Sequence, residues 1–219
     1  KTVGSFLNKI FRKEKTMKKK MNTTYMVELA VLIAIILIMA FTPIGYIRTL
    51  GLEITLIVVP VAVGAVTLGP MAGLILGTIF GITSFIQCFG MSAFGVMLLS
   101  INPVFTFIVC VPTRMLMGWL TGLIFQGLRK GSATKKIACP VSCLASPLLN
   151  TLFFMGAICI LFYQTDYIQS LVTSFGASNA LAFVIAFVGF NGLVEALASF
   201  IAGTAIAQAL LVVMRRSAK

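Results

Sequence analysis

The sequence contains no histidine and only five acidic residues among 219. Without histidine, a histidine-based catalytic triad, an HExxH zinc site and a histidine proton relay are all excluded. No GxxxxGK[ST] loop is present, so the chain has no Walker-type site for ATP hydrolysis. The ionisable groups inside apolar segments stand alone, with no nucleophile beside a base. We therefore do not expect an enzyme or catalytic residues.

Cysteine is also scarce, and no two cysteines form a CxxC pair. Cys139 and Cys143, which stand four residues apart, have no histidine or acidic residue near them in the sequence. Neither a metal site nor a cofactor is expected from this pattern. The five cysteines are read as small apolar packing residues.

Hydrophobic residues make up 59% of the chain and charged residues only 10%, which is typical of a membrane protein. A spanning helix needs roughly 20 mostly apolar residues. Six such runs are predicted, at about 25–43, 53–68, 71–87, 102–128, 137–163 and 180–213. The second and third runs meet at Leu68-Gly69-Pro70, which predicts a tight turn because proline suits the first turn of a helix but not its interior.

Lysine and arginine gather in three places: residues 1–20, 129–136 and 215–219. Basic loops tend to stay in the cytoplasm. With six spans all three segments lie on one side, whereas five spans would export the basic tail. The expected fold is thus an all-α integral membrane protein with six transmembrane helices and both termini cytoplasmic. Its parts are a basic leader (1–24), a membrane domain (25–214) and a basic tail (215–219).

The net charge of +12 is compatible with nucleic-acid binding, but the basic residues flank spans and no soluble domain presents them. A topology signal with some attraction to anionic lipid explains them better, and no nucleic-acid partner is expected. The leader either lies along the membrane surface through an apolar face or is disordered. It lacks the small-residue cleavage site of a signal peptide.

Small residues mark two helix surfaces. Gly69, Gly73, Gly77 and Gly81 recur every four residues in the third run, and a similar pair follows in the fourth, which predicts close packing of helices within the chain. Ala30 and Ala34 form a like pair in the first run. That pair either packs inside the bundle or receives another protein.

Five polar side chains lie within predicted spans, where each costs a few kcal/mol near the bilayer centre and usually faces a cavity or a partner. They are Asn102, Arg114, Asn150, Asn191 and Glu195. Counted along their helices, Arg114, Asn150, Asn191 and Glu195 lie about 18, 20, 16 and 22 Å deep, and Asn102 lies nearer the outer mouth. The amides suit a polar small molecule. Arg114 and Glu195 either pair with each other or contact the ligand.

Two outer segments are candidates for a lid. The segment 42–53 holds Tyr46 and Arg48 beside a proline and two glycines, and 88–95 is short, apolar and glycine-bearing. The alternative is that Arg48 merely sits at the water interface.

Several motifs together resemble a known family. AVLIA in the first helix, VGAVTLGPMAGLILGTIFG across the second and third, NP…PTRMLMGWLTGLIF in the fourth, and the closing SPLLNTLFFMGAICILF and FNGLVEALASFIAG are similar to the substrate-binding subunit (S-component) of energy-coupling factor (ECF) vitamin transporters. The resemblance covers roughly residues 21–216, and the long basic leader is a departure from it. The polar set, Asn102 to Glu195, is closest to the pantothenate branch.

The resemblance implies a bacterial multi-pass membrane protein that captures a vitamin from outside with high affinity. It implies further that Ala30 and Ala34 dock on a transmembrane scaffold subunit (T-component), that two cytoplasmic ATPases bind that scaffold, and that the S-component topples to release its cargo. Other vitamins (hydroxymethylpyrimidine, folate or cobalamin) stay open as substrates. A stand-alone secondary carrier and a ligand-free membrane scaffold are the alternatives outside the family.

Overall fold

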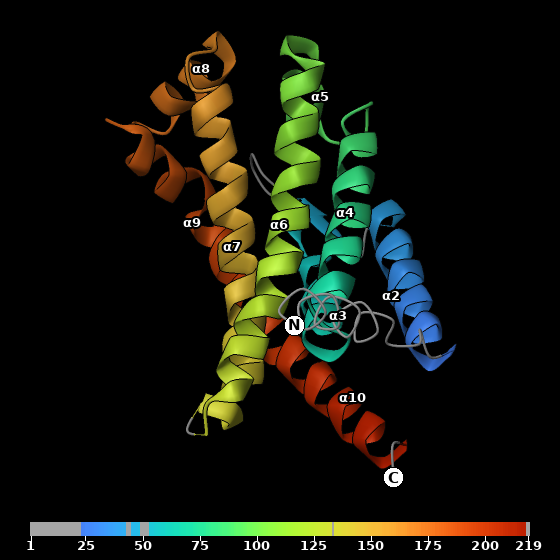
Figure 1. Cartoon of the computed structure of the whole chain (residues 1–219). Helices are drawn as coiled ribbons and strands as arrows, with labels where there is room; N and C mark the ends of the chain where they lie inside the picture. Colours follow the sequence, from blue (N-terminus) through green and yellow to red (C-terminus); the bar gives the residue numbers. More distant parts are fainter. Residues whose placement is uncertain (1–22, 43–44, 49–52, 133, 218–219) are drawn as a thin grey trace, which may run out of the picture.

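The computed structural model of the chain describes residues 23–42, 45–48, 53–132 and 134–217. This part is nearly all helical, with one short β-hairpin (Figure 1). In chain order the elements are α2 (Thr23–Phe41), β1 (Tyr46–Arg48), β2 (Glu53–Thr55), α3 (Val58–Thr67), α4 (Pro70–Gln87), α5 (Ala93–Ile101), α6 (Pro103–Lys130), η1 (Thr134–Lys136), α7 (Ala138–Leu161), α8 (Asp166–Ser174), α9 (Ala180–Ala198), the π-helical turn η2 (Ser199–Gly203) and α10 (Thr204–Ser217).

Within the described ranges, five helical segments are long and apolar enough to cross a membrane: Thr23–Phe41, Pro70–Gln87, Pro103–Lys130, Ala138–Leu161 and Asn191–Met214. Large apolar side chains are exposed along all of them, as the lipid-facing surface of a multi-pass membrane protein requires. The bundle is therefore a membrane bundle, and the predicted membrane class is confirmed.

The second predicted span, residues 53–68, differs from expectation. It consists of strand β2 and the 10-residue helix α3, which is about 15 Å long against the roughly 30 Å of a hydrocarbon core. Pro60 lies in the first turn of α3, and because proline is not tolerated deeper in a helix, it stops the helix from starting earlier. The count of six spans stays a prediction.

The segment between the first two predicted spans contains a β-hairpin, so the described part of the chain is not purely α-helical. Strands β1 and β2 pair antiparallel, with Tyr46 opposite Thr55 and Arg48 opposite Glu53. The hairpin leads directly into α3. It packs beside α9, so the connection reaches across the bundle to the last part of the chain.

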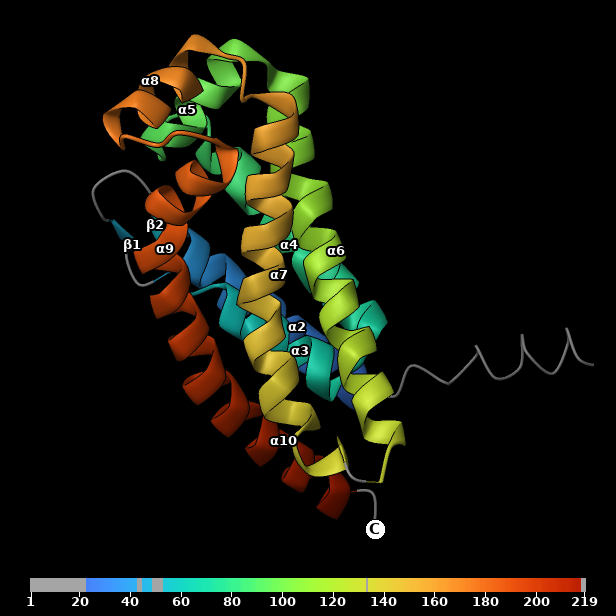
Figure 2. The same ribbon diagram turned by 90° about the vertical axis from the view of Figure 1, so that its left-hand side faces the viewer.

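The connection between α6 and α7 lies at the same end of the molecule as the C-terminal end of α10 (Figures 1 and 2). Both segments are basic, and the expected topology placed them on one side of the membrane. Helices α5 and α8 lie at the opposite end (Figure 2).

The glycines of α4 pack directly on α6, as their spacing predicted. A Cβ on Gly73 would overlap the carbonyl oxygen of Gly118, and one on Gly77 would overlap that of Arg114. A Cβ on Gly81 would lie 2.7 Å from the Cα of Val111. Gly69 precedes α4 with φ 103°, a conformation that favours glycine, and Pro70 opens the helix. The predicted turn is confirmed.

A proline also determines how the last part of the chain is attached. Pro147 lies inside α7 and has no N–H, so the carbonyl of Cys143 one turn earlier lacks its helical donor. The hydroxyl of Ser199, in η2, donates to that carbonyl at 2.8 Å. This bond ties η2 to α7 one turn beyond Glu195 and so fixes the height of α9 in the bundle.

We predict that Gly77→Ala destabilises the protein by about 1–3 kcal/mol, because its Cβ forces α4 away from α6. Thermal unfolding of the purified protein in detergent measures the effect. Gly156→Ala in α7 is the matched control, because nothing lies within 4 Å of its Cβ position. Equal melting temperatures for the two variants would contradict the close packing of α4 and α6.

Candidate binding site

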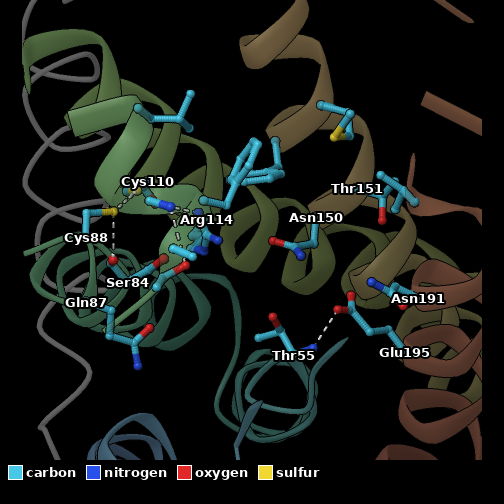
Figure 3. Close-up of a pocket in the computed structure, with 18 of the residues that line it drawn as sticks. Thr55, Ser84, Gln87, Cys88, Cys110, Arg114, Asn150, Thr151, Asn191 and Glu195 are labelled. Carbon is cyan, nitrogen blue, oxygen red and sulfur yellow. Dashed lines mark hydrogen bonds between the residues drawn. The ribbon is translucent and has the colours of Figure 1, made fainter. Parts of the chain in front are cut away.

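A cavity of about 380 Å³ lies inside the bundle. Its walls come from β2, α4, α5, α6, α7, α8 and α9. Figure 3 shows Arg114 on one side, Asn191 and Glu195 on the other, and Asn150 between them. These are the four polar residues that the sequence predicted to meet at mid-membrane depth, out of the five candidates.

Arg114 is a buried cation without a carboxylate partner among the described residues. Its side chain is 6% exposed. Its Nη1 donates to the carbonyls of Cys110 at 3.2 Å and Val109 at 3.4 Å, within the turn of α6 that contains Pro112. Its Nε has no hydrogen-bond partner. The guanidinium therefore lies at the cavity wall with one of its donors unused.

Two phenylalanine rings hold the guanidinium in place. The central carbon of Arg114 lies 4.8 Å from the ring centroid of Phe80 and 4.9 Å from that of Phe154. Both distances are in the range of cation–π attraction, which strengthens where water is excluded. Phe80 and Phe154 come from α4 and α7, so the packing of three helices fixes where the charge lies.

The amide of Asn150 also has unused capacity. The side chain is 8% exposed, and its Oδ1 has no hydrogen-bond partner. Five buried side-chain atoms in the described ranges lack a partner, and the two that belong to a cation and an amide, Arg114 Nε and Asn150 Oδ1, are both on residues that line the cavity. Unpaired buried polar groups are costly, and a bound ligand would remove that cost. Asn191, 8% exposed, lines the opposite wall.

Glu195 is used by the hairpin. Its Oε1 accepts a hydrogen bond of 2.7 Å from the backbone N–H of Thr55, at the edge of β2 (Figure 3). An open strand edge at membrane depth needs a partner, and Glu195 supplies it. The expected pairing of Arg114 with Glu195 is not found, since no ion pair joins them in the structure. The carboxylate instead fastens the hairpin to α9.

Asn102 does not reach the cavity. It is the N-cap of α6, and its Oδ1 accepts from the N–H groups of Val104 at 3.0 Å and Phe105 at 3.1 Å. An asparagine followed by proline at the start of an apolar run is a common helix-start signal, and capping accounts for it here.

The two predicted lid segments have different outcomes. Residues 46–48 form strand β1, but the side chains of Tyr46 and Arg48 lie outside the described part of the structure, so their lid role stays a prediction. The second segment does border the cavity, through Cys88, Ser92 and Gly95.

Several polar residues of the cavity were missed at the level of sequence: Thr55, Ser84, Gln87, Thr151 and Tyr167. Ser84 and Gln87 are polar, three residues apart, at the end of an apolar helix, which is the same signal that identified the asparagines. Nothing in the sequence marked Thr55. Among the described residues no group of three or more histidine, cysteine or acidic side chains is placed to hold a metal.

One side of the cavity is apolar and aromatic. Phe94, Leu98 and Met155 line it and belong to a buried cluster of α5 to α9. The ring of Phe94 lies 6.0 Å from that of Tyr167, centroid to centroid. Burial raises the pKa of Tyr167, so its phenol stays protonated and able to donate a hydrogen bond. The site thus offers a cation, amides and an apolar wall together.

Ala30 and Ala34 lie on the outer face of α2. Both are exposed, whereas Leu32, Ile36 and Ala40 of the same helix are buried against the bundle. Of the two alternatives left open by their spacing, packing inside the bundle is wrong. The surface they form faces outward.

The family model described as "ECF transporter, substrate-specific component" matches residues 24–207. No curated protein matches the chain. The matched range includes every residue of the cavity wall and ends within α10.

We predict that Glu195→Ala lowers the free energy of unfolding by about 1–3 kcal/mol, because the N–H of Thr55 is left buried and unpaired. Glu195→Gln keeps an acceptor oxygen at the same place and is the control. The measurement is the melting temperature of each purified variant. If alanine and glutamine destabilise equally, the hydrogen bond to the hairpin is not what Glu195 contributes.

Proposed function

Because the chain belongs to the family of ECF transporter substrate-specific components, we propose that it captures pantothenate outside the cell and delivers it to a scaffold subunit and two ATPases. The family is one of transporter subunits, not of enzymes. Its members bind vitamin-type substrates. The choice of pantothenate rests on the chemistry of the cavity.

The observation that carries the proposal is the pair of unsatisfied buried groups, Arg114 Nε and Asn150 Oδ1, on residues that line one cavity. A guanidinium binds a carboxylate side-on through Nε and a terminal nitrogen. The substrate that suits Arg114 is therefore an anion. The amide oxygen of Asn150 requires a donor, which a hydroxyl or amide N–H of the same molecule supplies.

Pantothenate has these groups in one small, flexible molecule. Its carboxylate suits Arg114, and its central amide and hydroxyls suit Asn150 and Asn191. Its geminal methyl groups suit the apolar wall of Phe94 and Met155. Glu195 also lines the cavity, but its carboxylate accepts from the N–H of Thr55 and forms no ion pair with Arg114, so the guanidinium is left for the carboxylate of the substrate.

The arrangement in the membrane belongs to the same proposal. Six passes, with the hairpin and α3 together making the second one, place both termini in the cytoplasm of a bacterial cell. The exposed face of α2 around Ala30 and Ala34 then docks on the transmembrane scaffold subunit. Small side chains allow a partner helix to approach closely, so dispersion contacts hold the two helices without a hydrophobic driving force.

We predict that the protein binds pantothenate roughly 10- to 100-fold more tightly than pantothenol, in which an alcohol replaces the carboxylate, because a hydrogen bond to a charged group contributes about 1.5–3 kcal/mol. Arg114→Gln should remove this preference while weakening pantothenol binding little. Isothermal titration calorimetry on purified protein, freed of endogenous ligand, measures the four affinities.

Asn102→Ala is the matched control, since that amide caps α6 and lies outside the cavity. It should lower the melting temperature and leave the ratio of the two affinities unchanged. An unchanged ratio in Arg114→Gln would show that Arg114 does not hold the carboxylate. If the protein does not bind pantothenate at all and the purified chain releases another vitamin, that vitamin is the substrate. The assignment to the family would still hold.

We predict that Ala30→Leu/Ala34→Leu abolishes pantothenate uptake by cells and leaves pantothenate binding to the purified subunit intact, because the change blocks docking and not the cavity. Ala205→Leu/Ala209→Leu in α10 is the control, an exposed alanine pair with the same spacing. Full uptake by the Ala30/Ala34 variant, at normal expression, would remove the docking assignment.

A further inference from the structure

A second cavity, of about 230 Å³, lies at the end of the bundle where α6, η1, α7 and α10 meet. It is open to the surface, at the end that also carries the C-terminal part of α10 (Figure 2). We refer to it as the basal groove. It is separate from the central cavity and shares no lining residue with it.

Three cationic side chains line the basal groove: Arg129, Lys135 and Lys136. They come from two elements, and no acidic residue is among the lining residues. The guanidinium of Arg129 lies 5.9 Å from the ring centroid of Phe125, which is buried at the floor. Helix α7 begins beside the groove without a side-chain cap, so the N–H groups of its first turn add partial positive charge. The groove is built for an anion.

The α10 side of the groove is mostly apolar. Leu211 and Val212 line it together with Gln208, and Val212 is 49% exposed. Leu211 and Val212 belong to a segment long and apolar enough to cross the membrane. A molecule held by the cations would therefore continue directly onto a lipid-facing apolar surface.

We propose that the basal groove binds an anionic phospholipid. The phosphate of the headgroup lies among Arg129, Lys135 and Lys136, and the acyl chains lie along α10 beside Leu211. A soluble anion would use the cations but not the apolar wall, and a neutral lipid would use the wall but not the cations. Basic pockets between membrane helices at the cytoplasmic face are suited to such headgroups.

The topology signal alone does not explain this arrangement. Basic residues that only set the orientation in the membrane do not need to line a cavity. Arg129 lines the groove, whereas its neighbour Lys130 on α6 does not. Comparing variants of these two residues therefore distinguishes a specific lipid site from general attraction of basic residues to the membrane.

The test is native mass spectrometry of the full-length protein released from bilayer discs that contain equal amounts of phosphatidylglycerol and phosphatidylcholine. We expect phosphatidylglycerol to be retained in preference. Arg129→Gln and Lys135→Gln should each reduce that preference about fivefold, the effect of one cation near a lipid headgroup. Lys130→Gln should leave it unchanged, and Arg129→Lys should retain most of it.

Melting temperatures in phosphatidylcholine alone check that each variant folds. If Arg129→Gln and Lys130→Gln lose the preference for phosphatidylglycerol equally, non-specific surface charge explains the lipid binding and the proposal is overturned. Stabilisation by inorganic phosphate equal to that by phosphatidylglycerol would make it a site for soluble anions instead. If Arg129→Gln and Lys135→Gln retain phosphatidylglycerol normally but no longer bind the ATPase subunits, the groove is a protein contact and the lipid proposal is overturned.

Discussion

The close approach of α4 to α6 is the constraint on which the central cavity depends. The backbones are near enough that a side chain on Gly77 would overlap the carbonyl of Arg114 itself. One turn later, Phe80 lies under the guanidinium of the same arginine. The glycine stripe thus does more than hold two helices together, because it sets the position of the buried cation relative to the ring that supports it.

At two places a side chain of the last helical segment bonds a backbone group that its own element leaves without a partner. Pro147 releases the carbonyl of Cys143, which Ser199 then satisfies, and the edge of β2 leaves the N–H of Thr55, which Glu195 satisfies. Both solutions use side chains from the last helical segment. In a hydrocarbon environment no water would replace these bonds, so each holds that segment against the bundle. The hairpin and the carbonyl freed by Pro147 in α7 therefore position α9, and with it Asn191.

The sequence predicted the site better than it predicted the connections. Rise per residue along apolar runs was enough to bring Arg114, Asn150, Asn191 and Glu195 to one depth, because polar residues in a membrane gather away from lipid. Asn102, which the sequence placed nearer the outer mouth, caps α6 and does not line the cavity. The sequence did not distinguish these two roles, since an N-cap at the start of a span has the same composition as a polar residue within it. The role of Glu195 was not predictable, because its partner is a backbone N–H of a hairpin that no pattern indicated.

The choice of arginine at position 114 follows from its three simultaneous contacts. Its guanidinium lies over the rings of Phe80 and Phe154, one terminal nitrogen bonds the carbonyls of α6, and Nε is left over. A lysine has no flat surface to lie against these rings and no fixed fork of donors, so it would satisfy one of these contacts and lose the others. The rings and the carbonyls hold the guanidinium in one place and leave the Nε–H as a donor without a partner. The packing that stabilises the charge therefore also selects the donor through which we propose that a carboxylate is bound.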